Sequence, residues 1–307
     1  MSSDKSTYKR NNIFEPAPKL GCSLCQGSGV IVGSYKENAT ASICACIPVC
    51  SRCAGVGFVH REENGSVVTG RCRCQKLPDR IEMFNRSNLP SRHGDKFLHT
   101  FEHLEKKSFL MMTEIQSWLS QFVEGNTPKG LVWYGGVGRG KTHLMAAVCR
   151  MLILEYGISV RFVEFSRLLG DLRTAYSAGL SEEAVLADLV NVPVLAIDEM
   201  GKGKLNDWQI SIIDDIISRR YNNLKPILAT TNYQWKGVSG NPPPALMSKE
   251  FTETLGDRIG ARAFSRLQEV SVPISLNGPD YRTLSPQDVE NLKNQVMGAS
   301  AFAKRFK

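Results

Sequence analysis

Residues 135–142 read Gly-Gly-Val-Gly-Arg-Gly-Lys-Thr and match the pattern G-x4-G-K-[ST]. Glycines let backbone N–H groups turn inward around phosphates, so the segment is predicted to bind a nucleoside triphosphate, the alternative being a purely structural turn. Lys141 would reach the β and γ phosphates, and the Thr142 hydroxyl would contact Mg²⁺. The predicted loop residues are Gly135, Gly136, Val137, Gly138, Arg139, Gly140, Lys141 and Thr142.

Two adjacent acids, Asp198 and Glu199, follow an apolar run at residues 194–197. At the end of a buried strand, Asp198 would hold Mg²⁺ together with Thr142, and Glu199 would polarise the attacking water. Asn232 follows another apolar strand, from where its amide could hydrogen-bond the water or the γ phosphate. The alternatives are a strand that ends in solvated acids and a simple turn asparagine.

Eight of the nine cysteines lie between residues 22 and 74, in two copies of one unit. Each copy has a C-x2-C pair, two glycines and a C-x-C pair, around a predicted β-hairpin. Because four thiolates bind one tetrahedral ion, two zinc sites per chain are predicted, with an iron–sulfur cluster as the alternative. The proposed ligands are Cys22, Cys25, Cys44, Cys46, Cys50, Cys53, Cys72 and Cys74.

The pairing of these ligands has two solutions. Each copy could be self-contained, which is the arrangement that we favour, or the four cysteines from Cys44 to Cys53 could form an inner site and the others an outer one. The ninth cysteine, Cys149, lies on an apolar helical face and is predicted to be buried.

The elements that must position the nucleotide loop and the acids alternate between strands and helices. Predicted strands occupy residues 131–134, 160–165, 193–197 and 226–230, and predicted helices occupy residues 109–123, 141–156, 166–176, 181–189 and 208–221. This alternation predicts an α/β fold with a doubly wound parallel sheet, in addition to a small N-terminal zinc-binding β-hairpin domain.

The chain is therefore predicted to hold two domains. We expect a disordered tail at 1–19, a tandem zinc-hairpin domain at 20–76, a linker at 77–96, a nucleotide-binding domain at 97–285 and a basic helix or tail at 286–307. The loop at 236–249 is interpreted as an insertion.

The 307 residues carry a formal net charge of +8, which favours nucleic acid or another acidic partner. Arg161, Arg167, Arg173 and Tyr176, and the cluster Arg219-Arg220-Tyr221, could contact single-stranded DNA, ordinary surface charge being the alternative. The polar start of the chain and the absence of a long apolar stretch lead us to expect a cytoplasmic protein without membrane contact.

Four further motifs resemble the DnaC/DnaI branch of the AAA+ ATPases, which load replicative helicases, and the related IstB transposition helpers. They are Phe97 and Phe101, Gly-Lys-Thr-His-Leu at 140–144, Ile-Asp-Glu-Met-Gly at 197–201 and Thr-Thr-Asn-Tyr at 230–233. The resemblance covers about the C-terminal two thirds and adds His143 to the nucleotide-binding residues. It implies ATP and Mg²⁺ as cofactors, ATP hydrolysis, and a replicative DNA helicase and single-stranded DNA as partners.

The segment 255–267 resembles the family's arginine-finger segment, with the finger at Arg266 and with Arg258 or Arg262 as alternatives. Arg282, after Tyr281, resembles the second sensor arginine. A finger acts on the nucleotide of a neighbouring subunit, so the resemblance implies self-association into an ATPase oligomer. Without this resemblance, salt bridges on a solvated helix would explain these arginines.

The cysteine units separately resemble DnaJ-type zinc hairpins, although two tandem copies depart from the single zinc module of some helicase loaders. Taken together, the resemblances favour an ATP-dependent loader of a replicative DNA helicase. The alternatives are an IstB-like transposition helper and a zinc-dependent adaptor of the chaperone type that uses ATP as a switch.

Overall fold

The computed structural model describes residues 16–101, 106–123, 129–235, 253–292 and 294. The chain divides into two compact units. The smaller unit comprises the described residues up to Asp95 together with Arg150–Ser159, and the larger unit comprises the remainder.

The larger unit is built on a five-stranded sheet in which all neighbouring strands run parallel. The strand order is β6-β7-β8-β5-β9. Because the strands are parallel, the loops that follow β5, β7 and β8 open at the same edge of the sheet. The strands are β5 (Gly130–Tyr134), β6 (Val160–Glu164), β7 (Val194–Asp198), β8 (Ile227–Thr231) and β9 (Ser271–Ser275).

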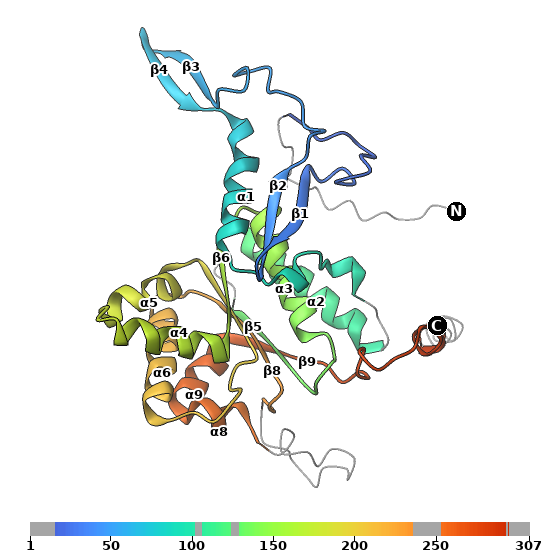
Figure 1. Ribbon diagram of the computed structural model, residues 1–307, viewed down its shortest axis with the longest axis vertical. Helices are drawn as coiled ribbons and strands as arrows, with labels where there is room; N and C mark the ends of the chain where they lie inside the picture. Colours follow the sequence, from blue (N-terminus) through green and yellow to red (C-terminus); the bar gives the residue numbers. More distant parts are fainter. Residues whose placement is uncertain (1–15, 102–105, 124–128, 236–252, 293, 295–307) are drawn as a thin grey trace. The chain divides into compact units, whose positions relative to one another are not determined.

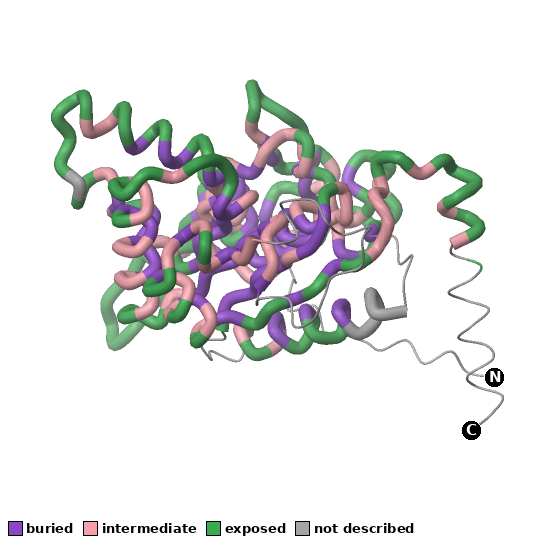
Figure 2. The backbone as a smooth tube through the Cα atoms, turned by 90° about the horizontal axis from the view of Figure 1, so that it is seen from below, coloured by how far each residue is buried: buried purple, intermediate pink, exposed green. Residues whose placement is uncertain are grey.

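Helices cover both faces of this sheet, and buried residues concentrate where helices and sheet meet (Figures 1 and 2). On one face, Val132, Leu195 and Ile197 pack against helices α4, α5, α6, α8 and α9, while α2 and α3 lie on the other. The predicted doubly wound α/β fold is confirmed. The helices are α2 (Lys106–Val123), α3 (Lys141–Leu154), α4 (Phe165–Ser177), α5 (Glu182–Asn191), α6 (Asp207–Asn222), α8 (Leu255–Ile259) and α9 (Ala261–Glu269).

The smaller unit contains two antiparallel hairpins, each closed by a two-residue turn. In the second turn Asn64 and Gly65 both have a positive φ, 53° and 78°, which is the left-handed geometry of a tight hairpin. The predicted hairpins are confirmed. The strands are β1 (Val30–Tyr35), β2 (Asn38–Ile43), β3 (Phe58–Glu63) and β4 (Ser66–Arg71).

Residues 77–96, which the sequence predicts as a linker, contain most of helix α1 (Lys76–Arg86) instead. Pro78 stands in the first helical turn, where a missing backbone N–H costs nothing, so it does not prevent the helix. Leu77, Ile81 and Phe84 form the buried face of α1. Arg80 lies between them and donates from Nη1 to the Leu154 carbonyl oxygen at 3.0 Å.

Three predicted segments lie wholly or largely outside the described residues: the tail at 1–19, the loop at 236–249 and the C-terminal helix or tail at 286–307. Residues 286–292 are helical. Among the helices that the structure describes, none combines the length and apolar character needed to span a bilayer.

Candidate nucleotide site and metal centres

The phosphate loop connects β5 to α3, as the motif requires. Its backbone depends on glycine at Gly138, where φ is 73° and a Cβ would lie 1.7 Å from the Asp280 carboxylate. The N–H of Tyr281 donates to the Gly138 carbonyl at 3.0 Å. The segment after β9 therefore lies directly against the loop.

Lys141 is buried at the base of this loop. Its ammonium group donates to the carbonyl oxygens of Gly135 and Gly136, at 2.8 and 2.7 Å. Burial, followed by the nearby charge of Arg139, lowers the pKa of Lys141 to about 8. The ammonium thus lies within the concave loop, at the position where phosphate oxygens would pair with it.

Thr142, at the end of the phosphate loop, lies beside Asp198, at the end of β7. The Thr142 hydroxyl donates to Oδ1 of Asp198 at 2.9 Å, and Thr230 on β8 donates to the same oxygen. Burial raises the pKa of Asp198, an effect that these hydroxyl donors oppose. A hydroxyl beside a carboxylate is the type of oxygen ligand that Mg²⁺ takes next to a bound phosphate, so these residues fit the metal.

Glu199 continues from Asp198 with an unusual backbone, because its φ is +56°. Its N–H donates to Oγ1 of Thr230 at 2.9 Å, and its carboxylate forms an ion pair with Lys202. Because this pair is partly exposed, the carboxylate is accessible to water. Sequence reasoning assigned no role to Thr230 or Lys202, although Thr230 belongs to the quoted Thr-Thr-Asn-Tyr motif.

Asn232 lies immediately after β8, which stands between β5 and β7 in the sheet. The residue is half-buried. The phosphate loop follows β5, Asp198 is the last residue of β7 and Glu199 follows it, so Asn232 emerges between the loop and the two acids. The structure therefore brings the loop, Asp198, Glu199 and Asn232 together at one edge of the sheet.

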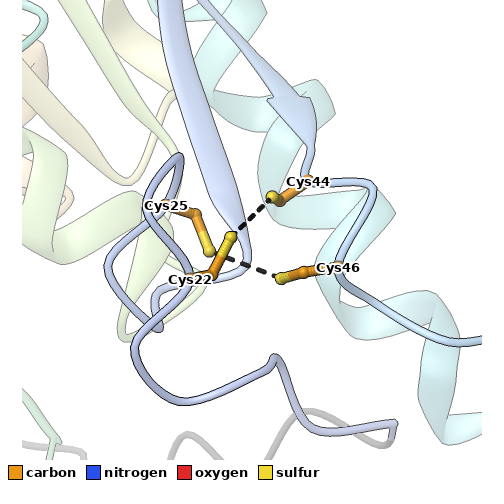
Figure 3. Close-up of side chains that lie close together, drawn as sticks. All are labelled: Cys22, Cys25, Cys44 and Cys46. Atoms are coloured by element: carbon orange, nitrogen blue, oxygen red, sulfur yellow. Dashed lines mark hydrogen bonds between the residues drawn. The ribbon is translucent and has the colours of Figure 1, made fainter.

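The eight paired cysteines gather into two self-contained groups, one for each hairpin. In the first group the sulfurs of Cys22 and Cys44 lie 3.7 Å apart and those of Cys25 and Cys46 lie 3.5 Å apart (Figure 3). The corresponding distances in the second group are 3.8 and 3.5 Å. Tetrahedral zinc with Zn–S bonds of about 2.3 Å requires sulfurs about 3.8 Å apart. Each of the two groups therefore fits one zinc ion of its own.

The local backbone prepares some of these thiols for metal binding. Hydrogen bonds from the backbone, first that of Cys25, lower the pKa of Cys22 to about 6. In the second group a backbone hydrogen bond from Gly57 lowers the pKa of Cys53 to about 7. Burial raises the pKa of Cys46 to about 12. Metal binding would require all four thiols of a group to ionise, and the two low values favour the first ionisation in each.

Comparison with known proteins places this site in a family. The sequence model of the family described as IstB-like ATP binding protein matches residues 87–260, which is more than half of the chain. This chain belongs to the IstB-like family. The matched residues include the phosphate loop, both acids and Asn232, and they begin after the cysteine groups.

Within this family the chain is similar to replicative helicase loaders named DnaC. The replicative helicase loader DnaC of Escherichia coli strain K12 is 28% identical over 177 residues, which cover 57% of this chain and 66% of the loader. DnaC of Buchnera aphidicola subsp. Acyrthosiphon pisum is 31% identical over 109 residues, covering 35% of this chain and 44% of that protein. The chain thus spans less than two thirds of these relatives.

A crystal structure of the DnaC helicase loader superposes with a TM-score of 0.50 at 29% identity, covering 61% of this chain and 99% of the other. It supports the predicted AAA+ fold, which the parallel sheet and the position of the phosphate loop also indicate.

The candidate finger arginines of this IstB-like chain differ in their contacts. Arg266 on α9 forms an ion pair with Asp214 on α6, at 2.8 Å between Nη1 and Oδ1. Arg258 donates to the Gly201 carbonyl at 3.2 Å and lies 5.0 Å from the centre of the Tyr233 ring. Arg262 is exposed at the start of α9.

Arg282 lies near the phosphate loop, because the N–H of the preceding residue, Tyr281, donates to the Gly138 carbonyl. His143 contacts residues that precede the nucleotide fold. Its Nε2 lies 3.2 Å from the Phe97 carbonyl oxygen, and its ring meets Phe101 edge-on at 5.6 Å. The two phenylalanines that precede the nucleotide fold thus contact the first turn of α3.

In the predicted DNA-contact cluster at residues 219–221, the assignment of Arg220 is wrong. Arg220 is fully buried and donates to five carbonyl oxygens where α5 ends and β7 and β8 begin, so it is a structural residue. Arg219 pairs with Asp215, and the Tyr221 hydroxyl donates to Glu269. Arg167 and Arg173 on α4 are exposed, whereas Arg161 is half-buried.

Proposed function

We propose that this protein is an ATP-driven loader that delivers a replicative DNA helicase onto single-stranded DNA. The observation that carries the proposal is the convergence of the phosphate loop, Asp198, Glu199 and Asn232 at one sheet edge, in a chain similar to the DnaC loaders. ATP and Mg²⁺ would occupy this edge, and two zinc ions per chain would hold the N-terminal hairpins.

Each residue at the sheet edge has a task that follows from its position. Lys141 would exchange its two carbonyl partners for the β and γ phosphates, and the loop N–H groups would bind the remaining oxygens. Thr142 and Asp198 would hold Mg²⁺, which when bound offsets the negative charge of the phosphates. Burial of these groups strengthens their attraction for the nucleotide.

Glu199 would accept a proton from the attacking water, after its carboxylate leaves Lys202. Asn232, which emerges beside it, would orient this water or hydrogen-bond the γ phosphate. Arg282 would add positive charge from the segment that packs on the loop. These groups would supply the base, the metal ligands and part of the positive charge for hydrolysis of the γ phosphate by water.

The finger would come from a second copy of the chain. Arg266 remains our assignment, and to act it would have to exchange Asp214 for the neighbour's phosphates. The exposed Arg262 is the competing assignment because it needs no such exchange. Arg262→Ala and Arg266→Ala separate them: the true finger variant loses turnover by about 10³-fold while its own nucleotide binding persists.

Single-stranded DNA would contact the surface formed by α4 and the start of α6. Tyr176 on α4 meets the Trp208 ring edge-on at 5.7 Å, and Trp208 remains 38% exposed. Arg173 is exposed one turn before Tyr176. An aromatic ring beside a positive charge suits stacked bases and their phosphates without regard to sequence.

The zinc module would dock on the helicase through its second hairpin. None of the twelve described residues of β3 and β4 is buried, and Phe58 and Val67 are among the exposed large apolar side chains. Exposed apolar side chains on a rigid hairpin suit contact with another protein.

A transposition helper is the second candidate, since the family takes its description from IstB. Such a helper would bind duplex DNA and a transposase. Capture of a transposase but not of the replicative helicase from the same source would favour this candidate over the loader.

The ATPase itself is tested with Glu199→Gln. We expect ATP binding to persist while steady-state hydrolysis falls by about 10² to 10⁴-fold, because the amide cannot accept a proton. Glu183→Gln, at an exposed glutamate on α5, is the control and should match the unaltered protein. Equal turnover in both variants would remove Glu199 from the mechanism.

A further inference from the structure

Two neighbouring threonines end β8 where this strand lies beside β7. Thr230 and Thr231 are both buried, yet their hydroxyls have different partners. Thr231 donates to the Met200 carbonyl at 2.8 Å and accepts from the Tyr233 N–H at 3.2 Å. Thr230 instead contacts Asp198, the last residue of β7, and Glu199, which follows it.

The Thr230 hydroxyl contacts both acids at once. It donates its hydrogen to Oδ1 of Asp198 and accepts the N–H of Glu199 at 2.9 Å. The Thr230 carbonyl oxygen accepts the N–H of Met200 at 2.7 Å. Three consecutive residues of the acidic segment are therefore attached to one residue of the neighbouring strand.

The attachment to Glu199 has a conformational consequence. With a φ of +56°, Glu199 adopts the left-handed conformation that side chains other than glycine rarely occupy. The bond from its N–H to Thr230 opposes relaxation of this conformation, which sets the direction in which the carboxylate leaves the backbone. Loss of the hydroxyl would leave a partly buried N–H without this acceptor and free the turn to relax.

The hydrogen bond from Thr230 to Asp198 has a separate consequence. Oδ1 accepts hydrogens from Thr142 and Thr230. Thr142 belongs to the phosphate loop, and in the proposed nucleotide complex its oxygen serves Mg²⁺. Thr230 belongs to the sheet and has no such second task, so it is the donor that keeps the Asp198 carboxylate oriented throughout.

We propose that Thr230 is a positioning residue for ATP hydrolysis, whose single hydroxyl orients the metal-binding carboxylate of Asp198 and the backbone of Glu199 together. This inference rests on the proposed ATPase function. It predicts that the hydroxyl affects turnover and Mg²⁺ dependence more than it affects the affinity for the nucleotide.

The test compares Thr230→Val, which has the same shape without the hydroxyl, with Thr230→Ser, which keeps it. Thr231→Val is the matched control, because it deletes an equally buried hydroxyl one residue away. We expect Thr230→Val to lower kcat by about 10²-fold and to raise the Mg²⁺ concentration needed for half-maximal rate, with ATP affinity within about threefold. Thr230→Ser should restore most of the rate, and Thr231→Val should stay within about threefold of the unaltered protein.

Equal losses of kcat in Thr230→Val and Thr231→Val, or no rescue by serine, would overturn the inference and leave the ATPase standing. If the unaltered protein binds ATP without hydrolysing it, the proposed function fails instead. The positioning role is then read from binding: the Mg²⁺ concentration that half-maximally strengthens ATP binding should be higher for Thr230→Val than for the unaltered protein and Thr231→Val. An equal Mg²⁺ effect in all three proteins would overturn it.

Discussion

The two cysteine hairpins share one sequence pattern but differ in their surroundings. Val30 in the first hairpin is 6% exposed, while Phe58, at the same place in the second, is 51% exposed. Ala39 is 1% exposed and its counterpart Val67 is 73% exposed. Figure 1 shows β1 and β2 along helix α1, whereas β3 and β4 extend beyond its end.

The difference arises from contacts that bury the first hairpin against α1 and the residues after it, whereas the second hairpin meets α1 through the exposed ion pair of Arg71 with Asp79. The Asn85 side chain accepts the Ala41 N–H at 2.6 Å and donates to the Ala41 carbonyl at 3.1 Å. The Ala39 N–H donates to the Leu89 carbonyl at 2.7 Å. The first hairpin is thus a structural anchor, and the second depends on its cysteine group and remains available for a partner.

Loss of the zinc ion from one cysteine group should produce the largest difference between the two hairpins. Cys50→Ser with Cys53→Ser should lower bound zinc from two to one per chain and remove hydrogen-exchange protection from all of β3 and β4, since such sites contribute about 10 to 16 kcal/mol of apparent folding free energy. Cys22→Ser with Cys25→Ser should also lose one zinc, but β2 should keep part of its protection through Asn85 and Leu89.

Metal analysis and hydrogen exchange of the same samples decide this comparison. Two zinc ions in either double variant would refute the ligand assignment. Equal loss of protection in both hairpins would contradict the anchoring role of α1.

A charge placed at equivalent positions of the two hairpins should produce the next largest difference, in the free energy of unfolding. Ala39→Asp buries a carboxylate without a partner and should lower the free energy of unfolding of the smaller unit by about 3 kcal/mol or more. Val67→Asp, at the exposed counterpart, should change it by less than about 0.5 kcal/mol. Denaturant unfolding of the zinc-loaded proteins measures both. Similar values would mean that the two hairpins are equally exposed.

Each hairpin also has one polar connection to α1, and these should differ in strength. Asn85→Ala leaves the Ala41 N–H and carbonyl without their side-chain partner and should cost about 1 to 3 kcal/mol. Asp79→Ala removes the ion pair with Arg71, whose side chain is largely exposed, and should cost less than about 1 kcal/mol. Unfolding curves that rank Asp79→Ala as the more damaging change would reverse the assignment of anchor and free hairpin.

The last difference concerns binding and leaves the fold unchanged. Val67→Asp should weaken capture of the replicative helicase of the same source about tenfold, or about 1.4 kcal/mol, by placing a charge in the docking surface. Tyr35→Asp, at an exposed position of the first hairpin, is the matched control and should bind normally. Weaker capture by the Tyr35 variant than by the Val67 variant would move the docking surface to the first hairpin.

Much of the fold follows from local patterns. The apolar strands of the sheet and the helices between them are near their predicted bounds, because each element carries its own periodicity. Helix α1 was missed because Pro78 and the polar residues around it indicate a linker, although its buried face is set by packing within the smaller unit. Strand β9 was missed because Pro273 interrupts a short run that forms a strand only beside β5.

Individual residues, too, could be predicted only where a local sequence pattern identifies them. The phosphate loop and the paired acids have recognisable patterns, and the sheet order brings them together as parallel strands require. Arg220 gives no sequence signal that separates a buried arginine from a surface one. The contacts of Thr230 and the different burial of the two hairpins depend on which elements become neighbours in the fold. A single amino-acid sequence does not contain this information.

The central claim is tested most directly by transfer of the helicase to closed circular single-stranded DNA, which offers no end for entry. In the presence of ATP, the unaltered protein should increase the amount of helicase retained on the circle, measured after removal of free protein. Glu199→Gln, and Cys50→Ser with Cys53→Ser, should each abolish most of that increase. Retention that is independent of this protein, or equal retention with all three forms, would contradict the account.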